Sequence, residues 1–250
     1  MIIKKFLSKL NISTYTVFLV FLAFLAGLFK EIIIISLIII IHEFGHFIML
    51  YRCNWKVIEI NIYPFGGITK LDDRIDKPLK EELLIALMGP IFQELLYLII
   101  FILYKYNLLN NYIYNIFKDY NITILIFNLL PIIPLDGSKI LNIILNKIFN
   151  FRLSYILNII ISILFLSLFI YIFKNDSSYY LLIVFFIYQI LYYYKNRYII
   201  YNRFILEKKL NKSNYIKHKK VNSIKKMYRN KRNLIKDTYY KTEYNYINKK

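Results

Sequence analysis

The sequence predicts an all-α, polytopic membrane protein with about six transmembrane helices, on the basis of its composition and of where its charge lies. Of its 250 residues, 58% are hydrophobic, against roughly 45–50% in typical soluble domains. A soluble domain of this size could not bury so much apolar surface. The net charge of +19 is uneven, because residues 201–250 hold 16 of the 34 Lys and Arg. We therefore expect a membrane domain over 1–200 and a basic cytoplasmic tail over 201–250, partly disordered or lying on the membrane surface.

Six apolar runs divide the first 200 residues. Each is close to the ~20 residues that an α-helix needs to cross the hydrocarbon layer of a bilayer. The first run follows a basic start, which is also typical of a cleaved signal peptide, but it is long and offers a poor cleavage site, so we interpret it as a span. The predicted spans are 13–29, 31–51, 83–104, 121–141, 153–173 and 179–200.

The Lys and Arg of the connections predict the orientation, because cytoplasmic loops of membrane proteins are enriched in these residues. With both termini in the cytoplasm, 30 of the 34 Lys and Arg fall in cytoplasmic segments. The charge is therefore mainly a topology signal. The sequence contains no recognisable nucleic-acid motif, so we expect no specific nucleic-acid partner. We expect the basic tail to contact anionic lipid headgroups instead.

The second run contains the sequence His42-Glu43-Phe44-Gly45-His46. Residues four apart lie on one face of a helix, so both imidazoles can ligate one zinc ion. Glu43 lies beside them and can activate a water as general base. Packed histidines without a metal are the alternative, but three ionisable groups at membrane depth are costly and usually functional. We therefore predict a site for a single zinc ion here.

Catalytic zinc needs a third protein ligand, and Asp136 is the best candidate. The only further histidine, His218, lies far out in the tail. Asp136 lies at the end of the fourth run, where Pro131, Pro134 and Gly137 are expected to break the helix. Broken helices at membrane depth occur where they line a cavity. The alternative is that Asp136 and Gly137 form an ordinary turn at a helix end.

Together these motifs resemble the site-2 protease family of intramembrane zinc metalloproteases, peptidase family M50. The resemblance rests on the His-Glu-Phe-Gly-His sequence followed by Asn128…Pro131…Leu135-Asp136-Gly137, and it extends over about residues 10–200. Two further segments, 128–137 and 64–67, resemble the sporulation branch of this family. That branch matures a late sporulation sigma factor from its pro-form.

The resemblance assigns the chemistry residue by residue. It implies that His42, His46 and Asp136 are the zinc ligands and that Glu43 is the general base. One position departs from the family. Members often have Asn three residues after a Gly-Pro pair in the third span, where this chain has Gln93.

The resemblance also implies a substrate-binding group. Asn128, Gly66, Gly67 and Pro134 match family positions near the substrate, and the two glycines belong to a re-entrant loop that can pair with an extended peptide. As alternatives, Asn128 could form a hydrogen bond between helices, and the glycines could belong to an ordinary cytoplasmic loop.

The predicted function is cleavage of a membrane-associated protein by a zinc-activated water. For the substrate, the resemblance implies the pro-form of a late sporulation sigma factor. It further implies inhibitory membrane partners and a location in the bacterial cell membrane or the mother-cell-derived membrane around a forespore. A site-2 protease acting on an anti-sigma factor or on remnant signal peptides is an alternative within the class. A metal transporter is an alternative of another class, but transporters are typically built from repeated halves, and no duplicated motif is present in this sequence.

Overall fold

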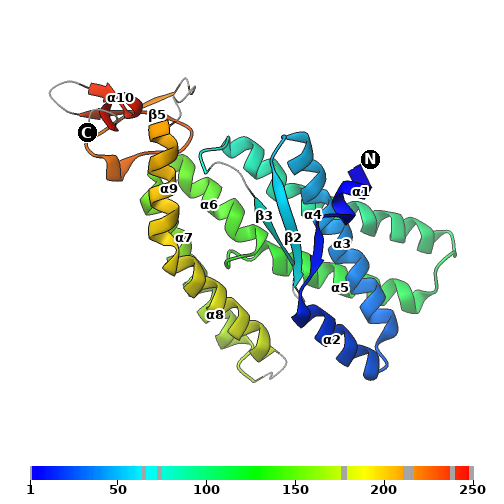
Figure 1. Cartoon of the computed structure of the whole chain (residues 1–250). Helices are drawn as coiled ribbons and strands as arrows, with labels where there is room; N and C mark the ends of the chain where they lie inside the picture. The colour runs from blue at the N-terminus through cyan, green and yellow to red at the C-terminus, as the bar shows by residue number, and fades with distance from the viewer. Residues whose placement is uncertain are drawn as a thin grey trace. The chain divides into compact units, whose positions relative to one another are not determined.

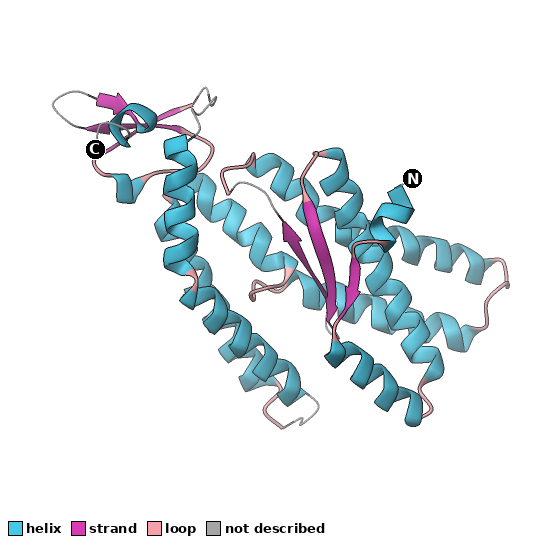
Figure 2. Ribbon diagram, in the orientation of Figure 1, coloured by secondary structure: helices cyan, strands magenta, loops and turns pink. Residues whose placement is uncertain are grey.

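The computed structural model describes residues 2–63, 66–71, 75–175, 179–210, 215, 217–236 and 240–247. The fold is mostly helical (Figure 1), as predicted. It also contains two three-stranded sheets (Figure 2), so the all-α prediction is wrong in that respect. The chain divides into two compact units, Met1–Asp73 with Leu84–Leu130 and Arg74–Leu83 with Pro131–Lys250. We call these the N-terminal unit and the C-terminal unit and describe each by itself.

The N-terminal unit combines helices with a small sheet. Side chains that accept hydrogen bonds from backbone N–H groups begin two of its helices: Ser13 caps α2 and Asn110 caps α5, as is usual at helix N-termini. Its elements are α1 (Ile2–Leu7), β1 (Leu10–Ile12), α2 (Thr14–Leu25), α3 (Phe29–Arg52), β2 (Val57–Tyr63), β3 (Gly66–Leu71), α5 (Asn111–Leu129) and most of α4 (Leu79–Lys105).

The sheet of the N-terminal unit has the strand order β1-β2-β3. The strand β1 is parallel to β2, and β3 is antiparallel to β2, with Gly67 opposite Ile62. A cluster of Phe6, Phe47 and Ile60 packs α1 and α3 against the sheet. The sheet is therefore fixed to the helix that carries the His-Glu-Phe-Gly-His sequence.

The longer part of the C-terminal unit, Pro131–Lys250, begins in a break between two helices. The helix α5 ends at Leu129 and α6 (Asp136–Ile148) begins seven residues later. The predicted break of the fourth run, 121–141, at Pro131 and Pro134 is therefore confirmed. Proline has no N–H to donate to a helical carbonyl, so it interrupts the helix. Within the break, the Ile133 N–H donates to the side chain of Ser162 (Oγ, 3.3 Å). The elements that follow are α7 (Phe151–Ile172), α8 (Tyr180–Lys195) and α9 (Arg197–Leu210).

Three of the described helices are long and apolar enough to cross a membrane: α3, α4 and α7. The most apolar stretch of α4 has only 22% of its residues buried, and that of α7 has 28%. Apolar side chains left uncovered on this scale indicate a non-aqueous environment. Two further apolar helices, α2 and α8, are shorter.

The basic tail is folded over much of its described length, where composition alone favoured partial disorder. The helix α9 continues across residue 200, where the tail was predicted to begin. After it come β4 (His218–Val221), η2 (Ile224–Lys226), β5 (Arg232–Lys236), β6 (Tyr240–Thr242) and α10 (Glu243–Ile247). Apolar tail residues, among them Phe204, Val221, Met227 and Ile235, form a buried cluster with Phe151. Burial of these apolar side chains offsets the conformational entropy that is lost when the polar tail becomes ordered.

A buried cation links this tail to the segment that precedes α4. The Lys208 side chain is 2% exposed and pairs with Asp76 (2.7 Å) and Glu243 (3.4 Å). A second pair joins Arg229 to Glu82 (2.8 Å). All of these residues belong to the C-terminal unit. The tail is thus held by ion pairs as well as by its apolar cluster.

We expect Lys208→Ala to destabilise the tail, because it leaves two carboxylates without their buried cation. Breaking one partner of a buried pair costs about 3–5 kcal/mol. Limited proteolysis of the full chain should then cut the tail at lower temperature than in the wild type. The control is Lys226→Ala, which removes an exposed cation. Equal protease resistance of the two variants would contradict the expectation.

Candidate metal centre

Three buried ionisable side chains project from one stretch of α3. His42, Glu43 and His46 are 3%, 4% and 5% exposed. The spacing of four residues places both histidines on one helical face, as predicted. The N-terminal unit therefore concentrates two imidazoles and one carboxylate in an otherwise apolar helix, where such groups need partners.

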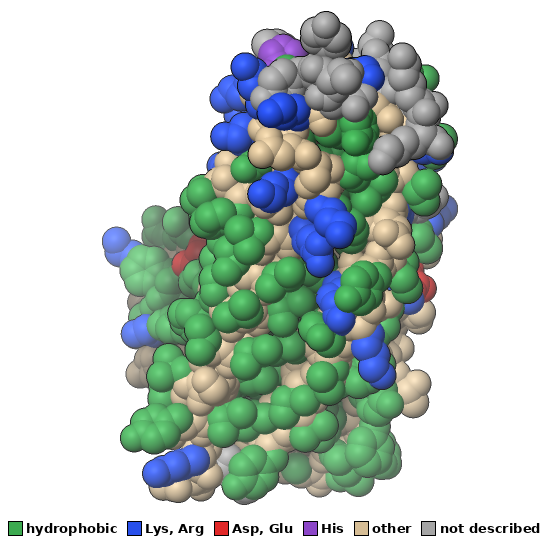
Figure 3. All heavy atoms as spheres, turned by 90° about the vertical axis from the view of Figure 1, so that its left-hand side faces the viewer, with side chains coloured by type: hydrophobic (Ala, Val, Ile, Leu, Met, Phe, Trp, Pro, Cys, Tyr) green, Lys and Arg blue, Asp and Glu red, His purple; other side chains and the backbone are tan. Residues whose placement is uncertain are grey.

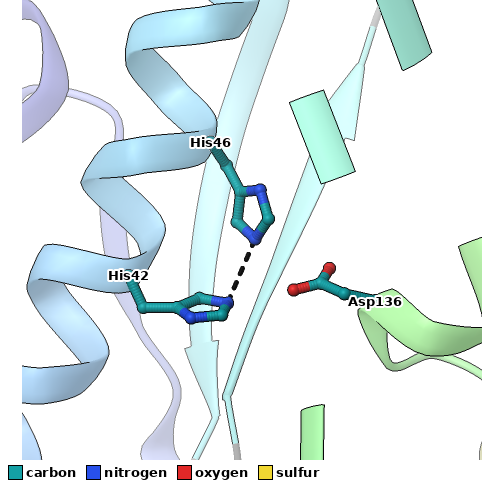
Figure 4. A group of neighbouring side chains, drawn as sticks. All are labelled: His42, His46 and Asp136. Atoms are coloured by element: carbon teal, nitrogen blue, oxygen red, sulfur yellow. Dashed lines mark hydrogen bonds between the residues drawn. The ribbon is translucent and has the colours of Figure 1, made fainter. Parts of the chain in front are cut away.

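Hydrogen bonds fix the tautomers of both histidines. Gln93 donates from Nε2 to the Asn121 carbonyl (2.9 Å), so its Oε1 faces His42 Nδ1 (3.0 Å). The Ile85 carbonyl lies 2.7 Å from His46 Nδ1. Both partners are acceptors, so both Nδ1 atoms donate and both Nε2 atoms carry lone pairs. The Nε2 atoms lie 3.1 Å apart and face each other in Figure 4.

This arrangement fits a zinc ion. Two lone pairs that face each other repel unless a cation lies between them. With Zn–N bonds of roughly 2.0–2.1 Å and tetrahedral geometry, two nitrogen ligands lie roughly 3.3 Å apart, close to the observed separation. Ligating histidines almost always donate their second ring N–H to an acceptor, as both do here. The donor set therefore suits zinc.

Two glycines allow α3 and α4 to approach at this point. A Cβ at Gly45 would overlap the Met88 backbone and the Phe92 side chain. A Cβ at Gly89 would overlap the rings of His42 and His46. Small residues are the usual means of close helix packing in membranes. The glycines bring the two acceptors of α4 within reach of the imidazoles.

The carboxylate of Glu43 is held by the sheet. The Gly67 N–H of β3 donates to Glu43 Oε1 (3.0 Å), and a Cβ at Gly67 would overlap the whole carboxylate. Glycine is therefore required for β3 to pass so close. The structure brings these two predicted site residues together.

Asn128 and Gly66 form a second neighbouring pair in the N-terminal unit. Asn128 is 7% exposed in the last turn of α5, and its Oδ1 lies 3.7 Å from the Cβ position of Gly66. Gly66 has a φ of 140°, a value that L side chains rarely adopt. Of the predicted segment 64–67, Pro64 and Phe65 lie outside the described residues.

Asp136 and Pro134 belong to the C-terminal unit. Asp136 is the first residue of α6 and is 4% exposed. It forms an ion pair with Lys139 (2.7 Å). A carboxylate has two oxygens with about four acceptor positions, so this pair leaves capacity for a cation. His42, His46 and Asp136 each offer one ligand atom of a type that zinc accepts.

Two groups that orient the histidines were not predicted from the sequence. The Ile85 carbonyl gives no signal, because every residue has one. In the sequence, Gln93 stands out only as a departure from the family. In the structure it is fully buried and contacts His42. The signal that points to it is a polar residue within the apolar run that becomes α4.

We expect Gln93→Ala to weaken zinc binding by about 10- to 100-fold, the usual effect of losing a partner of a ligating histidine. Gln93→Asn should fall between this variant and the wild type, because its amide is one methylene shorter. Zinc affinity is measured by competition with a chelator. Gln189→Ala on α8 is the matched control, and an equal affinity in both alanine variants would contradict the role of Gln93.

Comparison with known proteins agrees with this geometry. Residues 30–119 match the model of peptidase family M50. The chain is 31% identical over 133 residues to stage IV sporulation protein FB of Bacillus subtilis, covering 53% of this chain and 46% of that protein. It is 28% identical over 141 residues to zinc metalloprotease MJ0392 of Methanocaldococcus jannaschii, covering 53% and 41%. The chain thus spans about half the length of the curated relatives it matches.

A solved structure, the site-2 protease from Methanocaldococcus jannaschii, shares the fold. The TM-score is 0.57 at 20% identity, covering 76% of this chain and 89% of that one. The matched family region contains both histidines and the glutamate of α3. Over residues 30–119 the chain is therefore similar to peptidase family M50, and it shares the fold of a site-2 protease.

Proposed function

We propose that this protein is a site-2 type endopeptidase that uses one zinc ion to cleave a membrane-associated protein. The observation that carries the proposal is the buried pair of imidazoles of His42 and His46, whose Nε2 atoms lie 3.1 Å apart, beside the buried Glu43. The late sporulation sigma factor in its pro-form is the proposed substrate, supported by the 31% identity to stage IV sporulation protein FB.

The residues of α3 divide the work between metal binding and proton transfer. When bound, zinc supplies a Lewis acid that makes water a stronger nucleophile at neutral pH and polarises a carbonyl. His42 and His46 would hold it. Glu43 takes a proton from the attacking water and delivers it to the departing amine. Because Glu43 is buried, its carboxylate acts in a medium that strengthens electrostatic interactions.

Asp136 is the proposed third ligand. Its support is chemical: it is a buried carboxylate at the start of a helix that follows a proline-containing break. Backbone outside regular structure is tolerated at membrane depth where it lines a cavity. Three protein ligands leave one position for water, as in catalytic zinc sites generally.

The strand β3 is the proposed receptor for the substrate, with Asn128, Gly66, Gly67 and Pro134 as substrate-binding residues. Among the described strands, β3 pairs only with β2, so it is an edge strand of its sheet. An edge strand can add an extended peptide through main-chain hydrogen bonds. A substrate helix must unwind before its peptide bond can be cut, and pairing of this kind would hold it unwound.

The proposed topology has six spans with both termini in the cytoplasm, in the bacterial cell membrane or a membrane around a forespore. The three long apolar helices and the Lys and Arg distribution support it. Inhibitory membrane partners and contact of the tail with anionic lipid complete the proposal.

Cys53, the single cysteine, follows α3, so we expect membrane-impermeant thiol reagents to label it from the cytoplasmic side. Labelling from outside whole cells would reverse the orientation.

Substrates of other site-2 proteases, such as an anti-sigma factor or remnant signal peptides, are the alternative within the class. A metal transporter is the alternative of another class. The direct partnership of Glu43 with a strand edge favours the protease, because a transported ion requires no peptide-binding strand.

We expect Glu43→Gln to retain zinc while cleavage falls by about 10²- to 10⁴-fold, the usual contribution of a general base. The assay co-expresses the chain with a sporulation pro-sigma factor. Asp136→Ala should lose zinc as well as cleavage, whereas Asp119→Ala, at an exposed position of α5, should change neither. Cleavage by the Glu43→Gln variant at the wild-type rate would refute the protease assignment. Absence of Glu43-dependent cleavage of this substrate alone would remove only the sporulation assignment.

We expect Gly67→Val to reduce turnover without loss of zinc, because a branched side chain would displace both the Glu43 carboxylate and a paired substrate. Zinc content and cleavage rate are measured on the same preparation. Thr69→Val, two residues along β3, is the control. Unchanged turnover of the Gly67 variant would show that β3 takes no part.

A further inference from the structure

The C-terminal unit contains a cavity whose lining residues are separate in sequence from those of the metal centre. It has a volume of about 270 Å³ and lies between the first turns of α7, the start of α9 and η2. Three cations line it: Arg152, Arg197 and Lys225. None of the nine described residues that line it is acidic. The cavity therefore has a positive potential.

The walls of this cavity are tied together by hydrogen bonds. The Phe151 N–H donates to the Met227 carbonyl (3.0 Å), which joins α7 to the segment after η2. The Tyr201 hydroxyl donates to the Ile224 carbonyl (3.3 Å), which joins α9 to η2. The buried aromatic pair of Phe151 and Phe204 packs beneath. The cavity is thus a built feature of the fold.

Arg197 is held in a fixed orientation. Its guanidinium lies 3.7 Å from the ring centroid of Tyr194 and 4.4 Å from that of Tyr198. Its Nη1 donates to the Tyr194 carbonyl (3.0 Å) and its Nη2 to the Tyr198 hydroxyl (3.4 Å). A guanidinium has five N–H donors in a rigid fork that matches phosphate oxygens. Arginine oriented in this way is well suited to bind a phosphate group.

An apolar surface begins directly beside the cations. The helix α7, a candidate membrane span, starts at Phe151. On one of its faces Ile156, Ile160 and Ile163 are 39%, 47% and 50% exposed, and Ile156 also lines the cavity. A ligand that filled the cavity with a phosphate could lay an acyl chain along these side chains. A soluble anion or an acidic peptide would leave them uncovered.

We propose that this cavity binds the phosphodiester headgroup of an anionic phospholipid, with Arg152, Arg197 and Lys225 around the phosphate and an acyl chain along α7. Basic pockets at the cytoplasmic ends of membrane helices bind such headgroups. On the face drawn in Figure 3, Lys and Arg are most numerous in the upper half, and hydrophobic side chains predominate in the lower half, a division that suits a lipid–water boundary. The proposal requires a membrane location but not the proteolytic activity.

The test measures lipid binding to the delipidated full chain in detergent by native mass spectrometry, with phosphatidylglycerol and phosphatidylcholine as probes. The triple variant Arg152→Gln, Arg197→Gln, Lys225→Gln should bind phosphatidylglycerol roughly a hundredfold more weakly. Binding of phosphatidylcholine should not change. The control variant Lys217→Gln, Lys219→Gln, Lys236→Gln removes equal charge from the sheet of β4, β5 and β6 and the residue before it. Its affinity for phosphatidylglycerol should fall about threefold or less.

A single substitution guards against a folding defect of the triple variant. Asn202→Glu places a carboxylate at an exposed position of the same cavity and should weaken phosphatidylglycerol binding by roughly tenfold. An equal loss in the control triple variant would overturn the proposal in favour of diffuse attraction. Displacement of the lipid by millimolar inorganic phosphate, or by an acidic peptide, would overturn the lipid assignment. Because Glu43→Gln should bind lipid like the wild type, failure of this proposal and failure of the protease assignment are distinguishable.

Discussion

The metal centre depends on one constraint, the commitment of both histidine Nδ1 atoms as hydrogen-bond donors. Gln93 and the Ile85 carbonyl of α4 impose it. Once both protons are on Nδ1, both Nε2 atoms must present lone pairs to the same space. Gly45 and Gly89 allow α3 and α4 to approach closely at this point. The approach places Gln93 and the Ile85 carbonyl within hydrogen-bonding distance of the two histidines. The same helix contact that packs the N-terminal unit therefore also orients its two histidines.

The sequence was most informative where chemistry and periodicity coincide. The two histidines and the glutamate stand out because polar residues interrupt an apolar run at a spacing of four. The break near Pro131 was predictable because proline cannot continue a helix. The beginning of α5 at Asn111 was not, since its first ten residues mix polar and aromatic side chains and no apolar run marks them.

Contacts between residues far apart in the sequence, in sheets and in ion pairs, were harder to predict. The strand β2 does alternate, with Ile60 and Ile62 on one face and Glu59 and Asn61 on the other. The strand β3 begins with two glycines and carries Thr69 and Lys70 on opposite faces, so the alternation that marks a half-buried strand is weak there. The tail sheet was missed for another reason. Its cationic composition suggested disorder, but Lys208 is neutralised by Asp76, which lies 132 residues earlier in the chain. No local pattern can reveal an ion pair across that separation.

The folded tail changes how the boundary of the catalytic body should be drawn. Phe151 opens a candidate membrane helix, and the side chains that cover it come from α9 and from the strands beyond residue 217. A chain shortened after the last apolar helix would leave this aromatic ring without its cover. The segment that resembles a dispensable basic extension is therefore part of the support for α7, and its removal would alter the end of the helix on which the broken segment before α6 rests.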